Sequence, residues 1–204
     1  MSRSLDRFLS PIGVMLGVLV FAGSLPISAS AQESGGTPIY FGIGADFGFE
    51  DFDNVPSGID IDEAYGFNGW AGYRFSDLFA AELSLEYLNG FDFSFLGFDI
   101  NGQALASTVN AKIFPLARVV PERIEPFLYT GIGVAWVEYD TGFGDSDETG
   151  FAARFGGGID LYVTDNLALQ ASSSYVLPTG DLKDFSYVSL VFGIQYRFGR
   201  PPRS

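Results

Sequence analysis

The chain has 204 residues, including 26 Gly, 21 Phe and 10 Tyr. This length and composition favour a single domain built from short strands rather than helices. The absence of Cys and His excludes disulfides, thiolate metal sites and histidine-based catalysis. The formal net charge of -14 argues against a nucleic-acid partner, because such partners are bound by clustered Lys and Arg.

The first 31 residues have the three parts of a secretory signal peptide. Arg3 and Arg7 form a basic start, residues 11–23 form an apolar run, and the small residues 28–31 fit a cleavage site. We predict cleavage after Ala31 and a mature domain over residues 32–198. The apolar run is too short for a helical membrane anchor, so retention as an anchor is the weaker interpretation.

From residue 39 onward, large apolar residues alternate with polar or small ones. The run at residues 188–198 is the clearest case, because every second side chain from Val188 to Phe198 is apolar. This period of two is typical of strands with one apolar and one polar face. The pattern predicts eight strands: 39–49, 64–75, 79–88, 103–114, one beginning after Pro126, 151–163, 167–177 and 188–198.

The connections between these strands alternate in length. Residues 50–63, 89–99 and 140–150 are acidic or Gly-rich and are predicted to be long loops, whereas residues 76–78 and 164–166 are predicted to be tight turns. Residues 115–126 contain three prolines and are predicted to form a longer turn. This alternation matches long external loops and short periplasmic turns in a membrane barrel.

No segment after residue 31 has the continuous apolar length of a spanning helix. A strand-built membrane span must close on itself so that no backbone group is left unpaired in hydrocarbon. The fold predicted is therefore all-β, an eight-stranded antiparallel up-and-down transmembrane barrel. A secreted soluble barrel with an apolar interior shows the same alternation with its faces reversed and remains an alternative.

The chain resembles the small outer-membrane barrels of Gram-negative bacteria, the OmpA/OmpX type. The most specific element of the resemblance is the segment 193–198, in which Gly193, Tyr196 and Phe198 have the spacing of a C-terminal assembly signal. The resemblance implies location in the cell outer membrane and recognition by the barrel assembly machinery. Two features depart from it: residues 199–204 extend beyond Phe198 as a predicted periplasmic tail, and Val191 stands where a polar residue is usual.

Charged side chains recur on the predicted inner faces of the strands. They are Arg74, Glu82, Glu86, Lys112, Arg154 and Asp160. Eight strands leave an interior only wide enough for side chains, and buried charges need partners, so we expect an ion-paired network that fills the lumen. A polar conduit for small solutes is the alternative.

Candidate catalytic and metal sites are weak. The barrel enzymes that resemble this chain (outer-membrane phospholipases, lipid A deacylases and omptin proteases) rely on histidine, which is absent. The segment 145–150 begins like a calcium loop, but Thr149 and Gly156 occupy positions where the loop requires carboxylate or amide oxygens. Weak divalent binding at clustered acids remains a hypothesis, with Glu50, Asp51, Asp53, Asp145, Asp147 and Glu148 as the candidate ligands.

These observations predict a structural or surface-interaction protein with no catalytic activity and no cofactor. Its expected surroundings are outer-membrane lipid and lipopolysaccharide, and we expect a monomer. The alternative function is a narrow channel or carrier barrel for small or hydrophobic solutes, which single-channel conductance would separate from a closed barrel.

Overall fold

The computed structural model describes residues 39–50, 63–95, 98–117, 119, 123–140, 145–179, 182 and 186–198. The predicted signal peptide and tail lie outside these residues. In the described part of the chain, no helix has the length and apolar character needed to cross a membrane.

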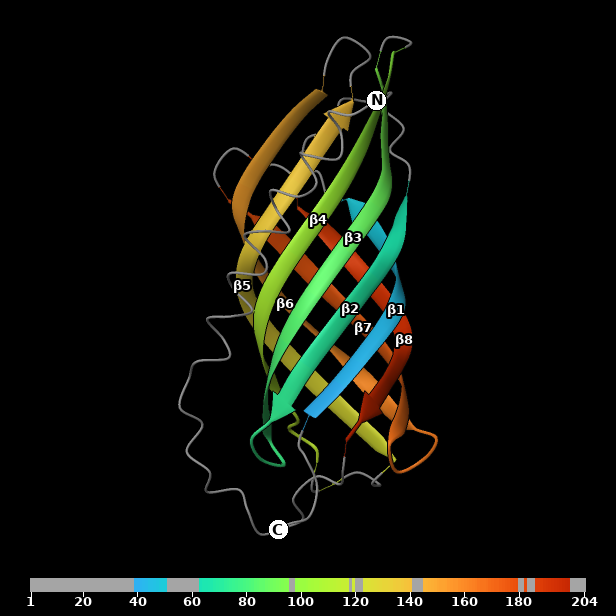
Figure 1. The fold of residues 1–204 in the computed structure, drawn as a ribbon, viewed down its shortest axis with the longest axis vertical. Helices are drawn as coiled ribbons and strands as arrows, with labels where there is room; N and C mark the ends of the chain where they lie inside the picture. Colours follow the sequence, from blue (N-terminus) through green and yellow to red (C-terminus); the bar gives the residue numbers. More distant parts are fainter. Residues whose placement is uncertain are drawn as a thin grey trace. The chain divides into compact units, whose positions relative to one another are not determined.

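The described residues form a closed barrel of eight antiparallel strands (Figure 1). The strands are β1 (Ile39–Glu50), β2 (Ala64–Arg74), β3 (Phe79–Phe95), β4 (Phe98–Ile113), β5 (Ile124–Asp140), β6 (Asp145–Tyr162), β7 (Leu167–Pro178) and β8 (Tyr187–Arg197). Each strand pairs with its neighbours in sequence, and β1 pairs with β8, from Tyr40↔Arg197 to Glu50↔Tyr187. The predicted eight-stranded up-and-down barrel is confirmed.

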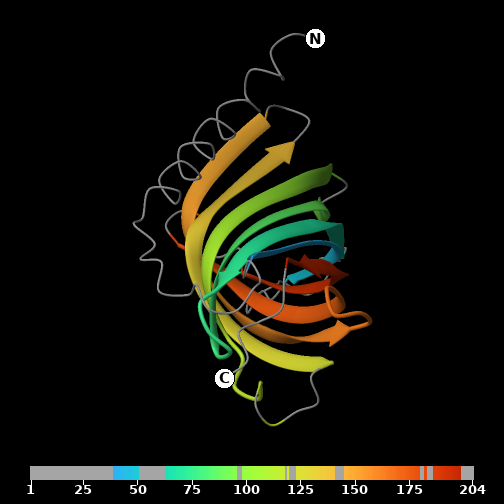
Figure 2. The same ribbon diagram turned by 60° about the horizontal axis from the view of Figure 1, so that its bottom comes forward.

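The period-two pattern separates the two faces of every strand. In β8, Phe192 and Ile194 are 55% and 51% exposed on the outer surface, whereas Ser189 and Gln195 are 0% and 3% exposed. Figure 2 looks obliquely along the barrel and shows the strands curving around a central lumen. The outer surface is therefore apolar and the interior largely polar, the reverse of a soluble barrel.

Two hairpins are longer than predicted. The pairing of β2 with β3 stops at Tyr65↔Asn89, but β3 continues with β4 to Phe95↔Phe98. Likewise β6 pairs with β5 from Asp140↔Asp145, well before its pairing with β7 begins at Ala152. The predictions of loops at 89–99 and 140–150 are therefore wrong for their described residues.

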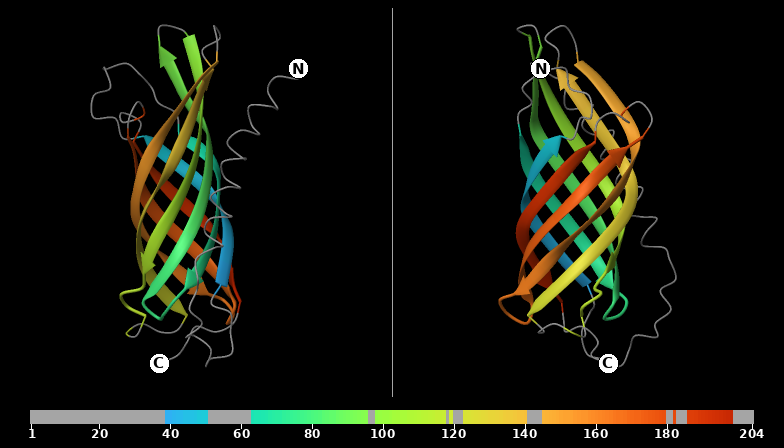
Figure 3. Two further views of the ribbon diagram at one scale, coloured as in Figure 1. Left: turned by 60° about the vertical axis from the view of Figure 1, so that its left-hand side comes forward. Right: turned by 180° about the vertical axis from the view of Figure 1, so that it is seen from behind.

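The reason is that pairing within each hairpin satisfies the backbone groups that a Gly-rich, acidic composition assigns to a loop. The four strands β3 to β6 extend past the others at one end of the barrel, here called the hairpin end (Figure 3). The opposite end, where β1 begins and β8 ends, is called the short-turn end.

The predicted turn at residues 115–126 is also too long, since β5 begins at Ile124. Pro126 lies within the strand and pairs with Ile159 of β6. The pairing of β4 with β5 begins only at Ile113↔Leu128, so Pro126 stands where β5 has no β4 partner. A proline is tolerated at such an edge because no ladder hydrogen bond requires its missing N–H.

Candidate functional site

The barrel lumen is the candidate site, since the predicted charged residues meet there. Arg74, Glu82, Glu86, Lys112, Arg154 and Asp160 are each at most 7% exposed. They come from the strands β2, β3, β4 and β6, and the structure divides them among three groups of contacts.

The first group surrounds Glu86 in the half of the lumen nearer the hairpin end. Arg154 donates to Glu86 Oε2 as a buried ion pair, and the Tyr187 hydroxyl donates to Glu86 Oε1. Ser189 Oγ and Asn68 Nδ2 also donate to Oε2, each at 3.1 Å. The group, here called the Glu86 cluster, consists of Asp46, Asn68, Ser84, Glu86, Arg154, Ser174, Tyr187 and Ser189.

Asp46 is the unusual member of the Glu86 cluster. It is 0% exposed and accepts hydrogen bonds from Ser189 at 2.7 Å and Asn68 at 3.4 Å. Within the described residues, no basic side chain lies at ion-pair distance from it. The cluster thus holds two carboxyl groups and one guanidinium.

The second group surrounds Lys112. Its Nζ lies 3.3 Å from Glu82 Oε2 and 3.8 Å from Asp160 Oδ2, and it stands 3.6 Å over the ring of Phe127. Tyr40 donates to Glu82 at 3.0 Å. The ammonium is therefore held by two carboxylates and an aromatic face, which compensates for its burial. The Glu82 cluster consists of Tyr40, Trp70, Glu82, Lys112, Asp160 and Gln195.

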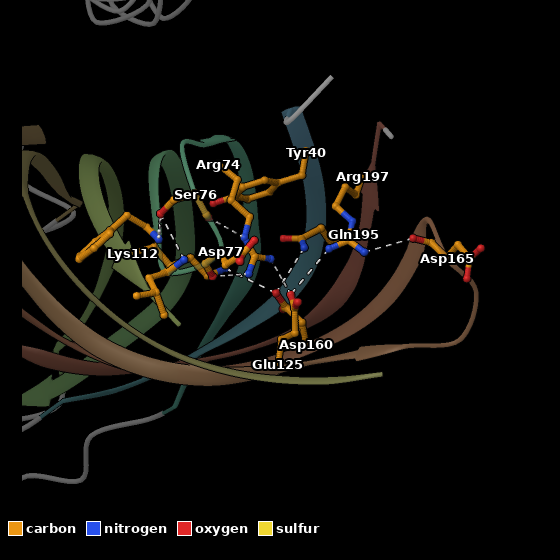
Figure 4. Close-up of polar contacts among 12 residues, drawn as sticks. Tyr40, Arg74, Ser76, Asp77, Lys112, Glu125, Asp160, Asp165, Gln195 and Arg197 are labelled. Atoms are coloured by element: carbon orange, nitrogen blue, oxygen red, sulfur yellow. Dashed lines mark hydrogen bonds and ion pairs between the residues drawn. The ribbon is translucent and has the colours of Figure 1, made fainter. Parts of the chain in front are cut away.

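The third group lies at the short-turn end (Figure 4). Arg74 pairs with Glu125 at 2.8 Å and stacks over the Phe114 ring at 4.0 Å. Arg197 reaches the same carboxylate at 3.8 Å and lies 4.2 Å over the Tyr162 ring. This mouth cluster, Arg74, Glu125 and Arg197, has one more positive than negative charge.

A small cavity separates the Glu86 and Glu82 clusters. Members of both clusters line it, together with neutral polar and aromatic side chains: Asn68, Trp70, Glu82, Ser84, Asn110, Phe127, Tyr129, Arg154, Gln170, Ser172 and Val191. The space within it that can hold the centre of a water molecule is about 10 Å³. This cavity has no room for an organic solute.

The end of the lumen above the Glu86 cluster is apolar. Buried side chains from β2 to β8 pack there with Leu182, which lies between β7 and β8. This apolar layer consists of Ala64, Leu88, Ala104, Ala106, Ala135, Val137, Ala152, Val176, Leu182 and Tyr187.

Of the three residues of the predicted assembly signal, Gly193 and Tyr196 lie on opposite faces of β8, and Phe198 directly follows its last residue. Tyr196 and Phe198 are 40% and 43% exposed on the outer surface, where their rings contact each other and Phe41. Gly193 faces the lumen, and a Cβ there would lie 2.7 Å from the Trp70 ring. Their role in assembly stays a prediction.

Sequence reasoning missed three charged members of the site. Asp46 and Arg197 stand on the polar face of their strands, so the same alternation could have included them. Glu125 was assigned to the proline-rich turn, and only the pairing of β5 with β6 places it inside.

No metal-binding group of three or more His, Asp or Glu occurs in the described part of the chain. Of the candidate divalent ligands, Asp51 and Asp53 lie outside the described residues, as do the side chains of Glu50, Asp145 and Asp147.

Comparisons with solved structures agree with this geometry. Neisserial surface protein A is 18% identical, with a TM-score of 0.59 and coverage of 81% of this chain and 100% of that one. The attachment invasion locus protein Ail of Yersinia pestis is 16% identical, with a TM-score of 0.57 and coverage of 81% and 100%. The N-terminal barrel domain of Pseudomonas aeruginosa OprF is 16% identical, with a TM-score of 0.51 and coverage of 80% and 99%.

A search of curated protein sequences found no match. The family model for the outer membrane protein beta-barrel domain matches residues 17–198, nearly the whole chain. Location in the outer membrane follows from this match together with the apolar outer surface and closed sheet. The chain belongs to the outer membrane protein beta-barrel domain family.

Proposed function

We propose that this protein is a non-catalytic outer-membrane barrel that presents a surface for interaction with molecules outside the cell. The observation that carries the proposal is the extension of β3 to β6 beyond the closed ring (Figure 3). An ordered sheet that continues past the barrel wall offers a rigid platform, and loops on rigid platforms are where binding residues concentrate.

The packing of the lumen supports this function over a channel. The apolar layer and the ion-paired clusters stand one behind the other along the barrel axis, and the cavity between the clusters has water-sized room. An eight-stranded barrel whose interior is filled by side chains leaves no aqueous path. A carrier would have to displace both the apolar layer and the ion-paired clusters to let a solute pass.

The absence of catalysis is supported by chemistry. The chain has no His, and each predicted interior acid, Glu82, Glu86 and Asp160, already has a basic partner. General acid–base catalysis needs a group within hydrogen-bond reach of a substrate, and these three acids are buried at 7%, 1% and 0% exposure.

The negative net charge of the chain limits the classes of partner that we expect. One structure similar in fold shows Ail in complex with the heparin analogue sucrose octasulfate (19% identity, TM-score 0.57, 80% of this chain and 99% of that one covered). This chain carries 25 Asp and Glu against 11 Lys and Arg, and the segments 50–63 and 140–148 are acidic. We therefore infer that its partner is neutral or basic rather than a sulfated polysaccharide.

The proposed function is tested by producing the chain in the outer membrane of a Gram-negative host that does not adhere by itself. The adherence of the cells is then measured. Cells producing the full chain are compared with cells whose hairpin residues 91–101 are replaced by an Asn-Gly turn, on wells coated with basement-membrane protein extract and wells coated with heparin. We expect full-chain cells to adhere several-fold better on the protein coat and neither strain to adhere to heparin. Equal adherence of the two strains, at equal amounts of folded barrel, would overturn the surface role.

We further propose that the barrel is a monomer, surrounded by outer-membrane lipid and lipopolysaccharide and inserted by the barrel assembly machinery. The exposed apolar belt of all eight strands supports this, since it leaves a complete lipid-facing surface around one copy.

A further inference from the structure

The cavity between the Glu86 and Glu82 clusters contains buried polar atoms without partners. Asn110 is 1% exposed and lines the cavity, yet neither its Oδ1 nor its Nδ2 has a hydrogen-bond partner among the residues that the structure describes. Gln170, 7% exposed, lines the same cavity, and its Oε1 is also without a partner. Buried amide groups in folded proteins are almost always hydrogen-bonded, so these three atoms call for a further hydrogen-bonding partner.

The size of the cavity limits that ligand. The space open to the centre of a water-sized molecule is about 10 Å³. This is close to the smallest space that holds a single water, and a water needs two to four polar partners. Asn110 and Gln170 supply one donor group and two acceptor oxygens, and Ser84 and Ser172 add hydroxyl groups to the wall.

The charges on the wall exclude ions. Arg154 opposes a cation and Glu82 opposes an anion, and both line the same small space. Both charged groups already have ion-pair partners, Glu86 and Lys112 respectively, so neither requires a counter-ion from the cavity. The remaining requirement is for a neutral molecule that both donates and accepts hydrogen bonds.

We propose that this cavity is a built site for one buried water molecule, which accepts from Asn110 Nδ2 and donates to Gln170 Oε1. The site goes beyond the surface role and does not depend on it. The water thus satisfies two buried amide side chains that belong to neither cluster, in the space between the two clusters. The apolar layer lies toward the hairpin end, so we expect it to slow exchange of the water with solvent.

Water-to-protein nuclear Overhauser effects in the mature barrel, folded in detergent micelles, test the site directly. We expect a cross-peak between water and the Asn110 side-chain amide with the sign of a long-lived complex. The signal requires no substitution, so it remains decisive even if a variant fails to fold.

Oxygen-17 magnetic relaxation dispersion provides a second measurement by counting long-lived waters. Ser172→Val places methyl groups in the cavity, and Ser173→Val is the matched control because Ser173 lies on the exposed outer face. We expect Ser172→Val to lose about one long-lived water relative to wild type, and Ser173→Val to lose none. A missing Asn110 cross-peak, equal counts in both variants, or a cross-peak that changes with the type of salt cation would each overturn the proposal.

Discussion

At the scale of single residues, two neighbouring acids of the interior differ in their hydrogen-bond donors. Within the described residues, Glu86 accepts from Arg154, Tyr187, Ser189 and Asn68, whereas the neighbouring Asp46 accepts from the neutral side chains of Ser189 and Asn68. Removing one partner of a buried ion pair leaves an uncompensated charge, while neutralising a carboxyl that has no ion pair leaves none. The two acids are therefore expected to respond differently to the same chemical change.

Glu86→Gln should destabilise the barrel by about 3 kcal/mol, because it leaves the buried Arg154 without its counter-charge. Reversible urea unfolding of the mature barrel in lipid vesicles, followed by tryptophan fluorescence, measures the loss. Trp70 lies inside the barrel at 5% exposure and reports on the packing of the lumen.

Asp46→Asn is the matched control in the same cluster. An amide keeps the acceptor for Ser189, so we expect a change within about 1 kcal/mol of wild type. A loss at Asp46 as large as that at Glu86 would show that the negative charge of Asp46 pairs with Arg154.

The sequence predicted which residues enter the lumen but not their partners. Alternation assigns Glu86 and Arg154 to the inner face because the side-chain period of a strand is fixed at two. Their pairing spans β3 and β6, 68 residues apart, and depends on the tilt and stagger that close the barrel. Glu125 was missed for a related reason. It lies on β5 because the pairing of β5 with β6 continues through Pro126.

At the scale of strands, glycines on the inner faces make room for aromatic rings. A Cβ on Gly42 would overlap the Trp70 indole, which donates to Gln195 at 2.9 Å. Gly69 lies on the outer face of β2, and a Cβ there would be 4.0 Å from its nearest neighbour atom, so a methyl group fits. The effect on stability of replacing a strand glycine with alanine thus depends on which face of the strand the glycine occupies.

Gly42→Ala should destabilise the barrel by about 1–3 kcal/mol, the range for overpacking a filled core. Gly69→Ala should leave stability unchanged or raise it slightly, because alanine restricts the unfolded chain. The same urea titration compares the two variants. A larger loss at Gly69 than at Gly42 would contradict the assignment of Gly42 to a crowded inner wall.

The last strand carries a prediction about assembly. Phe198 lies on the outer surface beside Tyr196 and Phe41 at the junction of β8 and β1. A charge there opposes both aromatic packing and the lipid interface, so Phe198→Glu should lower the amount of folded protein in the membrane far more than Arg203→Glu. Heat-modifiable gel mobility of isolated outer membranes measures it. Equal effects of the two changes would remove the assembly role of Phe198.

At the scale of the whole molecule, long paired hairpins stand at one end of the barrel where the sequence predicted long loops. The sequence predicted loops at both places because residues 89–99 are rich in Gly and Phe and residues 140–150 are acidic. Antiparallel pairing between the arms of a hairpin is a long-range property that composition does not encode, so strands β3 to β6 were underestimated. The result is an ordered sheet beyond the ring rather than a set of separate loops.

The lumen has two seals in series, and this predicts the electrical behaviour of the barrel. Ions must cross both the apolar layer and the ion-paired clusters, and the cavity of about 10 Å³ between the Glu86 and Glu82 clusters does not make a path. The mature barrel should give no single-channel steps in planar bilayers. The Glu86→Ala/Arg154→Ala double variant should also be silent, because it removes both members of one pair but leaves the apolar layer in place.

Reproducible conductance steps in the wild-type barrel, absent from detergent-only controls, would favour the narrow-channel function. Steps confined to the double variant would instead show that the ion-paired clusters are the main barrier and that the apolar layer alone does not exclude water.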